Sequence, residues 1–202
     1  MVSKFFEENK LWKKGIKKVV GIDEAGRGPL AGPVTAAAVM VFKNPGLKFS
    51  GVNDSKKLSA QKREMFFELL IKDKNIKWGI GVVSEKVIDK INIKNAAELA
   101  MEKAVKKLKI KPDFLLIDGN NLKNKKLKAM NYKLIVGGDG KVFSCMAASI
   151  LAKVYRDRIM MKYHQKYSQY GFDQHKGYPT ALHKVRCRKY GLCPIHRRSF
   201  SF

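Results

Sequence analysis

The sequence predicts an α/β fold with a helical C-terminal portion over about residues 144–202. Short apolar runs typical of buried strands alternate with amphipathic helical segments up to residue 136, and helical spacing dominates afterwards. The 202 residues, 45% of them hydrophobic, suffice for one core that buries roughly 70% of the surface of the unfolded chain. We therefore expect a single domain that covers residues 1–202.

Five segments have the length, apolar content and flanking turn residues of strands. The first is expected to end at Asp23 and Glu24, and a tight turn marked by Gly26, Gly28 and Pro29 follows, which predicts a hairpin with the second. The expected strands are 19–22, 33–42, 76–83, 114–117 and 132–136.

Five further segments repeat their apolar residues at helical spacing. Gly15 can end the first helix, and Ser59 stands at the N-cap of the second. Residues 120–128 are basic, and we expect a loop there. The expected helices are 5–14, 59–71, 95–108, 144–167 and roughly 179–190.

The charge of the chain restricts its partners. Its 42 Lys and Arg residues against 17 Asp and Glu residues give a formal charge of +25, so the surface should attract nucleic acid, an anionic membrane or acidic proteins. No apolar run reaches the length of about 18 residues that a membrane span needs, and the N-terminus lacks the layout of a signal peptide. Three cysteines do not suggest a disulfide framework, so we expect a cytoplasmic protein.

Acidic residues stand where three of the apolar strands end. Asp23 with Glu24, Asp118 and Asp139 each precede a turn that contains glycine. Ligand sites in α/β sheets tend to lie at the carboxyl ends of strands. Carboxylates gathered there would repel one another unless they were protonated, paired with basic residues or neutralised by cations. Oxygen ligands suit Mg²⁺ or Mn²⁺. The alternative is that each acid simply forms a turn or caps a helix.

Motifs along nearly the whole chain resemble those of type 2 ribonucleases H, specifically the bacterial ribonuclease HII family. The matching segments are 21–34 (GIDEAGRGPLAGPV), 53–58 (NDSKKL), 117–120 (IDGN), 138–141 (GDGK), 147–154 (AASILAKV), 156–157 (RD), 175–180 (HKGYPT) and 196–200 (HRRSF).

The resemblance implies an RNase H-like fold, in which helices flank a mixed β-sheet, and a metal-dependent endonuclease. Such enzymes cut the RNA strand of RNA–DNA hybrids and cut 5′ of single ribonucleotides within duplex DNA, leaving 5′-phosphate and 3′-hydroxyl ends. The implied roles are removal of ribonucleotides from DNA and removal of RNA primers. A monomer is expected. Such enzymes can contact a sliding clamp, but no clear tail motif for that contact stands in this sequence.

By the same resemblance, Asp23, Glu24, Asp118 and Asp139 form a four-carboxylate site for Mn²⁺ or Mg²⁺, with two ions in the active complex. Two divalent cations can activate water and stabilise the leaving oxygen. No side chain is then needed as nucleophile, which agrees with the absence of a Ser–His–Asp pattern from the sequence.

The resemblance also assigns substrate contacts. The backbone of Gly26, Arg27 and Gly28 would contact the ribose 2′-hydroxyl, the group that distinguishes RNA from DNA. Tyr178 would pack on the sugar of the next deoxynucleotide. A plain tight turn and a packed loop anchor are the alternatives for these two features.

Basic and polar residues of the motifs are candidates for contacts with the phosphate backbone. Lys56, Lys57 and Lys141 are expected to bind phosphates, and Asn120 is a weaker candidate. In a chain this basic, any single lysine is more often simply solvated, so the motif alone distinguishes these three.

A group of three residues lies at i, i+4 and i+8 of one expected helix and so shares a face. These are Ser149, Lys153 and Asp157. We interpret the last two first as a structural ion pair near the site, and second as groups that tune the metal.

Two other hypotheses concern the C-terminal portion. His183, Cys187, Cys193 and His196 could bind zinc, but their spacing differs from the common C-x₂₋₄-C pair, and packed cysteines are the simpler expectation. The chain could also be a non-catalytic RNA- or DNA-binding module. Acids at three strand ends argue against a pure binder, because without metal they would repel phosphate.

Overall fold

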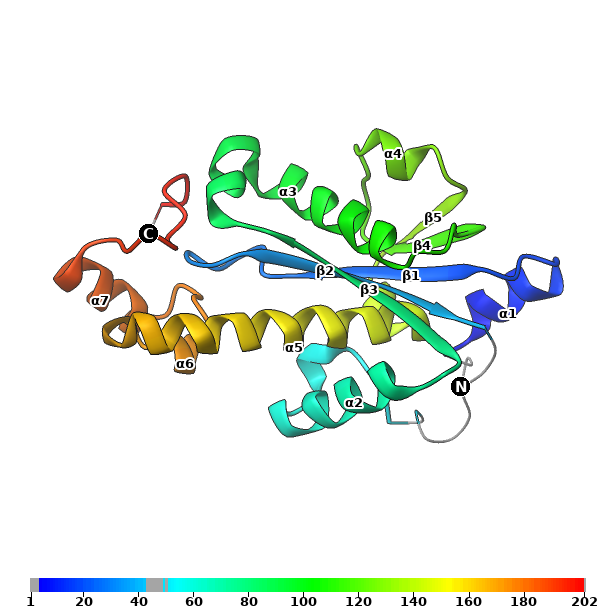
Figure 1. Cartoon of the computed structure of the whole chain (residues 1–202), viewed down its shortest axis with the longest axis horizontal. Helices are drawn as coiled ribbons and strands as arrows, with labels where there is room; N and C mark the ends of the chain where they lie inside the picture. Colours follow the sequence, from blue (N-terminus) through cyan, green and yellow to red (C-terminus); the bar gives the residue numbers. More distant parts are fainter. Residues whose placement is uncertain (1–3, 43–48, 50, 202) are drawn as a thin grey trace.

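A computed structural model describes residues 4–42, 49 and 51–201. Its centre is one five-stranded sheet with the order β3-β2-β1-β4-β5 (Figure 1). Strand β2 pairs antiparallel with β1 and β3, whereas β1, β4 and β5 run parallel, so the predicted mixed sheet and its hairpin are confirmed. The strands are β1 (Val19–Ala25), β2 (Val34–Val41), β3 (Ile76–Val83), β4 (Phe114–Asp118) and β5 (Tyr132–Ile135).

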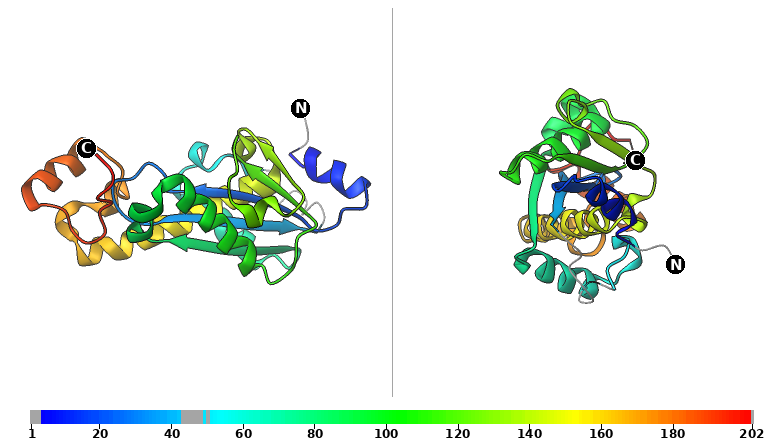
Figure 2. Two further views of the ribbon diagram at one scale, coloured as in Figure 1. Left: turned by 90° about the horizontal axis from the view of Figure 1, so that it is seen from above. Right: turned by 90° about the vertical axis from the view of Figure 1, so that its right-hand side faces the viewer.

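Helices cover both faces of the sheet. Helix α3 lies on one face and α5 on the other, α2 lies beyond α5, and α6 and α7 gather with the C-terminus at one end of the molecule (Figures 1 and 2). The helices are α1 (Phe6–Lys13), α2 (Ala60–Lys72), α3 (Glu85–Lys107), α4 (Lys125–Lys128), α5 (Phe143–Lys166), α6 (Phe172–His175) and α7 (Ala181–Tyr190). None of the described helices combines the length and apolar composition needed to cross a membrane.

Side chains along β1 point alternately to the two faces of the sheet, one covered by α3 and the other by α5. Val20 and Ile22 pack into the core beneath α3. Gly21 faces α5, where a Cβ would lie 2.3 Å from the backbone carbon of Ser144. The helix therefore packs directly on the strand backbone. Because side chains alternate along a strand, Asp23 lies on the same face as Gly21, beside α5.

Three elements differ from the sequence expectation. Strand β1 extends to Ala25 because β2 continues to pair with it beyond Asp23. Helix α3 begins at Glu85, ten residues before the expected start, and continues past a kink at Asn92 (φ 64°), a residue type that tolerates left-handed backbone. The expected loop 120–128 contains the short helix α4, whose first N–H groups bond to the Asn124 side chain.

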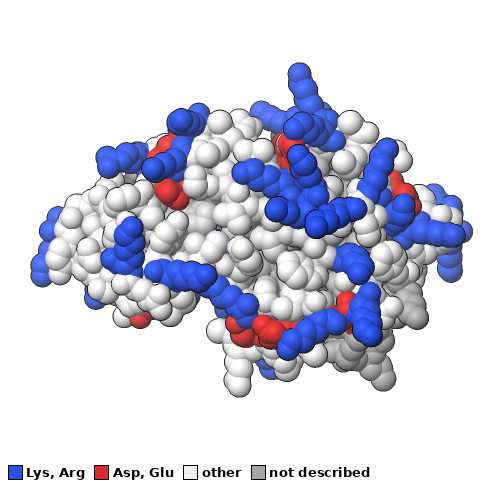
Figure 3. All heavy atoms as spheres, in the orientation of Figure 1, with Lys and Arg blue, Asp and Glu red and all other residues white. Residues whose placement is uncertain are grey.

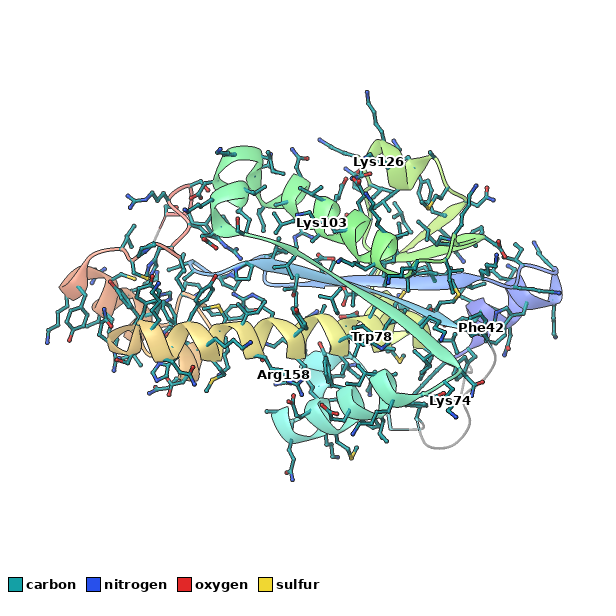
Figure 4. The ribbon with its side chains drawn as sticks, viewed as in Figure 1. Phe42, Lys74, Trp78, Lys103, Lys126 and Arg158 are labelled. Carbon is teal, nitrogen blue, oxygen red and sulfur yellow. The ribbon has the colours of Figure 1, made fainter. Side chains whose placement is uncertain are left out.

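Charged side chains tie the outer helix α2 to α5. The guanidinium of Arg158 on α5 points toward α2 (Figure 4), donates to Glu64 and Glu68, and lies 4.3 Å from the centre of the Phe67 ring. The N-terminus of α5 is held differently: buried Glu8 of α1 accepts hydrogen bonds of 2.8 Å from both the N–H and the hydroxyl of Ser144. Together these contacts hold the helix that lines the candidate site.

Candidate active site

Three buried or half-buried aspartates converge at the centre of the sheet. Asp23 lies in β1, Asp118 ends β4, and Asp139 lies in the 3-10 turn Gly138–Gly140 (η3) that follows β5. The parallel register pairs Ile22 with Ile117, which sets the first two acids side by side on neighbouring strands. One carboxylate oxygen of each aspartate lies within 4.8 Å of the others.

The backbone and one lysine hold these carboxylates in place. The N–H of Gly138 donates to Asp118 Oδ1 at 2.8 Å, and the N–H of Glu24 donates to Asp23 Oδ1 at 2.7 Å. Lys56 Nζ donates to Asp139 Oδ2 at 3.0 Å. Each aspartate therefore has one fixed oxygen and presents a carboxylate to the shared centre.

Glu24, the fourth acid predicted for the site, lies outside the group of three. Its Oε1 accepts a hydrogen bond of 3.2 Å from Arg27 Nη1. Its side chain nevertheless borders the same clefts as Asp118. The structure thus brings three of the four predicted carboxylates into one cluster and leaves the fourth at its edge.

Burial makes this cluster electrostatically costly without a cation. Desolvation, followed by the charges of Glu24 and Asp118, raises the pKa of Asp23 well above its usual range. Desolvation also raises the pKa of Glu24 and Asp118; Arg27 partly offsets the increase for the former, and Asp139 adds to it for the latter. Oxygen donors that are desolvated and mutually repelling are the chemistry that a hard divalent cation relieves. The three aspartates and the adjacent Glu24 therefore fit the metal that the sequence implied.

A cleft of about 380 Å³, here called the central cleft, opens beside the carboxylates. It brings together most of the residues predicted for the site from distant parts of the chain. Its lining includes Asp23, Glu24, Gly26, Arg27, Gly28, Lys56, Asp118, Ser149, Lys153 and Tyr178. Asn120 lines a neighbouring cleft of about 440 Å³ that shares Glu24, Arg27 and Asp118 with it.

Four predicted residues do not line either cleft: Lys57, Lys141, Asp157 and Asp139, the last of which lies in the group of three aspartates. Lys57 is exposed to solvent. Lys141 is also exposed, and its Nζ donates to the Val136 carbonyl at 2.6 Å. Asp157 accepts a hydrogen bond of 2.8 Å from Lys153, which confirms the expected ion pair. Asp157 therefore contacts the cleft lining at Lys153.

Ser55 is a site residue that the sequence reasoning did not single out. Its hydroxyl lies 2.8 Å from that of Ser149, and both side chains are buried. Ser149 also hydrogen-bonds Asp23. Since a carboxylate can only accept, Ser149 donates to the ionised Asp23 and accepts from Ser55. The motif 53–58 contained Ser55, but the sequence offered no partner for it.

Two buried arginines, which the sequence reasoning gave no role, hold the loop that carries Gly26 and Gly28. Arg197 is 1% exposed and Arg156 is 0% exposed. Among the described residues neither has a carboxylate within salt-bridge distance, and burial lowers the pKa of Arg197 to about 9. Arg197 donates to the carbonyls of Gly26, Arg27, Gly32 and Pro33, and Arg156 to those of Ala31, Pro33 and Lys176.

The two glycines of this loop differ in their surroundings. Gly26 has a φ of +97°, and a Cβ there would lie 2.2 Å from Arg156 Nε, so the fold itself requires glycine. At Gly28 the one neighbour near a Cβ would be the Tyr178 ring, 3.9 Å away. The fold leaves room for a side chain at Gly28, and that room is part of the central cleft.

One face of the molecule is strongly basic. Lys and Arg side chains are spread over the face shown in Figure 3, and acidic side chains form only small groups there. The chain carries a net charge of +25. Such a surface attracts a polyanion such as a nucleic-acid backbone independently of its sequence.

The fold has a close counterpart among solved structures. The crystal structure of ribonuclease H2 from Pyrococcus horikoshii OT3 superposes with a TM-score of 0.76 over 91% of this chain and 94% of that one, at 30% sequence identity. The sheet, its flanking helices and the carboxylates on its central strands define a nuclease of the ribonuclease H-like class.

Sequence comparison identifies the branch of that class. The family model described as ribonuclease HII matches residues 20–202. Ribonuclease HII of Chlamydia caviae is 48% identical over 99% of this chain and 92% of its own length, and that of Acetivibrio thermocellus is 50% identical over 96% and 73%. The chain belongs to the ribonuclease HII family, and is therefore a ribonuclease H that acts on RNA–DNA hybrids.

The carboxylate cluster should destabilise the metal-free protein at neutral pH. A carboxyl whose pKa is raised by folding contributes stability at low pH and loses it as pH rises through the folded pKa. Asp118→Asn removes one buried charge and its repulsion of Asp23. In EDTA at pH 7.5 we expect this variant to melt several degrees above the wild type, with the difference shrinking toward pH 4.

Differential scanning fluorimetry across this pH range measures the effect. Glu7→Gln is the control, because Glu7 forms a half-exposed surface ion pair with Lys133, of a kind worth little to stability. A metal-free Asp118→Asn protein that melts at or below the wild type at pH 7.5 would contradict the electrostatic account.

Replacing Arg197 by lysine should loosen the loop that carries Gly26 and Gly28. Lysine keeps the charge but cannot donate to four carbonyls at once, and loss of hydrogen bonds to a buried charged group costs about 2–4 kcal/mol in total. We expect a lower free energy of unfolding in urea and at least a tenfold loss of cleavage at a temperature where the variant is folded. Arg198→Lys, at the exposed neighbouring position, should change neither quantity.

Proposed function

We propose that this chain cuts DNA duplexes 5′ of a single embedded ribonucleotide, in addition to cutting the RNA strand of hybrids, and leaves 5′-phosphate and 3′-hydroxyl ends. The observation that carries the proposal is the central cleft, where the glycine loop and Tyr178 face the carboxylate cluster. Asp23, Glu24, Asp118 and Asp139 would hold two Mg²⁺ or Mn²⁺ ions. A bound divalent cation supplies Lewis acidity that activates water and stabilises charge on the phosphate.

Recognition of the ribose rests on the backbone of residues 26–28. A 2′-hydroxyl both donates and accepts, so backbone N–H and C=O groups can read it. The carbonyls of Gly26 and Arg27 already accept from Arg197, which fixes the orientation of these peptides. Gly28 has no Cβ, so a sugar can approach the backbone there.

We propose that Tyr178 tests the next sugar. Its ring is 37% exposed and lines the central cleft. Lys153 Nζ and the Arg156 guanidinium lie 5.5 and 5.7 Å from the ring centre, which limits the movement of the ring. We propose that the ring packs on the deoxyribose that follows the ribonucleotide, where a 2′-hydroxyl would collide with it.

The remaining polar residues orient the acids and the phosphates. Ser149, supported by Ser55, fixes one side of Asp23. Lys56 and Lys153 line the cleft and bring positive charge to where a scissile phosphate would lie. Lys56 is bound to Asp139 and so can shift from the carboxylate to a phosphate when a cation takes over the acid. We further propose a role in removing ribonucleotides and RNA primers from DNA in the cytoplasm, as membership of the ribonuclease HII family implies.

A defined duplex tests the proposal directly. With Mg²⁺ or Mn²⁺, a DNA duplex that carries one ribonucleotide should be cut once, 5′ of that ribonucleotide, and an all-DNA duplex should stay intact. EDTA should abolish cleavage. Asp118→Asn should lower the cleavage rate at least a thousandfold while duplex binding persists. If the wild type bound the duplex tightly but did not cut it with either metal, the nuclease proposal would be wrong, and the chain would be a non-catalytic nucleic-acid-binding module.

Alanine at the two loop glycines should separate folding from recognition. Gly28→Ala should keep the melting temperature within about a degree, because its Cβ meets only the Tyr178 ring at 3.9 Å, yet lower cleavage at a single ribonucleotide at least tenfold. Gly26→Ala should lower the melting temperature itself, because its Cβ would collide with Arg156. Unchanged cleavage by Gly28→Ala would remove this glycine from ribose recognition.

A further inference from the structure

A second group of metal-ligating side chains lies away from the carboxylates, in the C-terminal portion. His183 and Cys187 lie one turn apart on α7 and face His196 of the segment that follows. The three side chains are 0%, 4% and 3% exposed. The sequence reasoning had set this group aside because its spacing lacked a C-x₂₋₄-C pair; the fold nevertheless brings the three donors together.

The donor atoms of this group point at one another. His183 Nε2 lies 3.1 Å from His196 Nε2, and Cys187 Sγ lies 3.2 Å from the same nitrogen. Around a tetrahedral zinc ion, donors of these types stand about 3.4 Å (N to N) and about 3.6 Å (N to S) apart. The observed distances need to widen by only a few tenths of an ångström to admit an ion.

The far side of the His183 imidazole is held as in metal-binding histidines. His183 Nδ1 lies 2.9 Å from the Tyr178 carbonyl, so Nδ1 carries the proton and Nε2 presents its lone pair to the cluster. His196 Nδ1 instead accepts a hydrogen bond of 3.0 Å from the Cys193 N–H, so a neutral His196 carries its proton on Nε2. An ion would bind Nε2 only after that proton left, or after the ring changed tautomer and donated from Nδ1 to the Cys193 carbonyl, 3.3 Å away. A carbonyl partner of this kind orients the ring and raises the basicity of the opposite nitrogen.

We propose that His183, Cys187 and His196 form a zinc site that is chemically distinct from the carboxylate cluster. Two nitrogens and one sulfur suit Zn²⁺, whereas the all-oxygen cluster suits Mg²⁺ or Mn²⁺. Cys193 is not one of the three ligands, because its Sγ lies 3.1 Å from Nδ1, on the opposite edge of the His196 ring. The fourth ligand of a tetrahedral ion would come from solvent.

The site would join α7 to two segments that support the central cleft. His196 precedes Arg197, the residue that binds the carbonyls of the glycine loop. His183 holds the Tyr178 carbonyl. An ion shared by the two histidines and Cys187 would therefore link α7, the C-terminal segment and the segment of Tyr178, and so strengthen the scaffold behind substrate recognition. This inference does not depend on which duplex the enzyme cuts.

Cobalt is the probe, because tetrahedral Co²⁺ bound to sulfur has an intense charge-transfer band that oxygen-bound Co²⁺ lacks. The full chain is stripped with a chelator, supplied with excess Mg²⁺ and titrated with Co²⁺. We expect one equivalent to give the sulfur-to-cobalt band with tetrahedral visible bands, and Zn²⁺ to bleach both. Zn²⁺ should also raise the melting temperature of the stripped wild type by several degrees.

Variants assign the band to the proposed ligands. Cys187→Ser and His183→Asn should lose the band and the shift in melting temperature, with the metal-free melting curves showing that both are folded. Cys145→Ser is the matched control, a buried cysteine whose Sγ contacts the Leu116 carbonyl instead, and Cys193→Ser should also keep the band. No charge-transfer band in the wild type, a band that survives Cys187→Ser, or one lost in either control would overturn the proposal and leave a hydrogen-bonded core cluster.

Discussion

The parallel pairing of β1 with β4 is the constraint on which the rest of the site depends. It places Asp23 and Asp118 on adjacent strands at the centre of the sheet, where both are partly or wholly removed from water. The two carboxylates cannot reduce their repulsion by moving apart, because the paired strands fix the positions of their Cα atoms. Three donors partly stabilise that fixed negative charge by hydrogen bonds: the Gly138 N–H, the Ser149 hydroxyl and the Lys56 ammonium.

Positive charge is buried a few residues away from these carboxylates, against the loop that follows β1. Arg156 and Arg197 bury positive charge with only carbonyl oxygens as hydrogen-bond partners among the described residues. A planar guanidinium with five donors can satisfy several converging carbonyls, which a lysine cannot do. The loop of residues 26–33 has little regular structure of its own, and these two side chains replace the missing backbone hydrogen bonds.

The sequence was sufficient for the sheet and for most of the cleft, because both follow from local patterns. Apolar runs that end at an acid predicted β1 and β4, and the motif resemblance assigned the residues that meet in the central cleft. Other features depend on contacts between distant segments. The early start of α3 rests on an unusual backbone angle at Asn92, the role of Arg197 on carbonyls about 170 residues earlier, and the pairing of Ser55 with Ser149 on the docking of α5. No local pattern contains that information.

The buried guanidiniums of Arg156 and Arg197 also make the distribution of charge along the central cleft uneven. One end presents clustered carboxylates, and the other is backed by two positive charges that the low-dielectric interior screens only weakly. In the metal-free protein the charges at the two ends of the cleft therefore differ, and cations bound by the carboxylates would reduce that difference. Because both guanidiniums are buried in the scaffold, this difference in charge is present before any cation or nucleic acid binds.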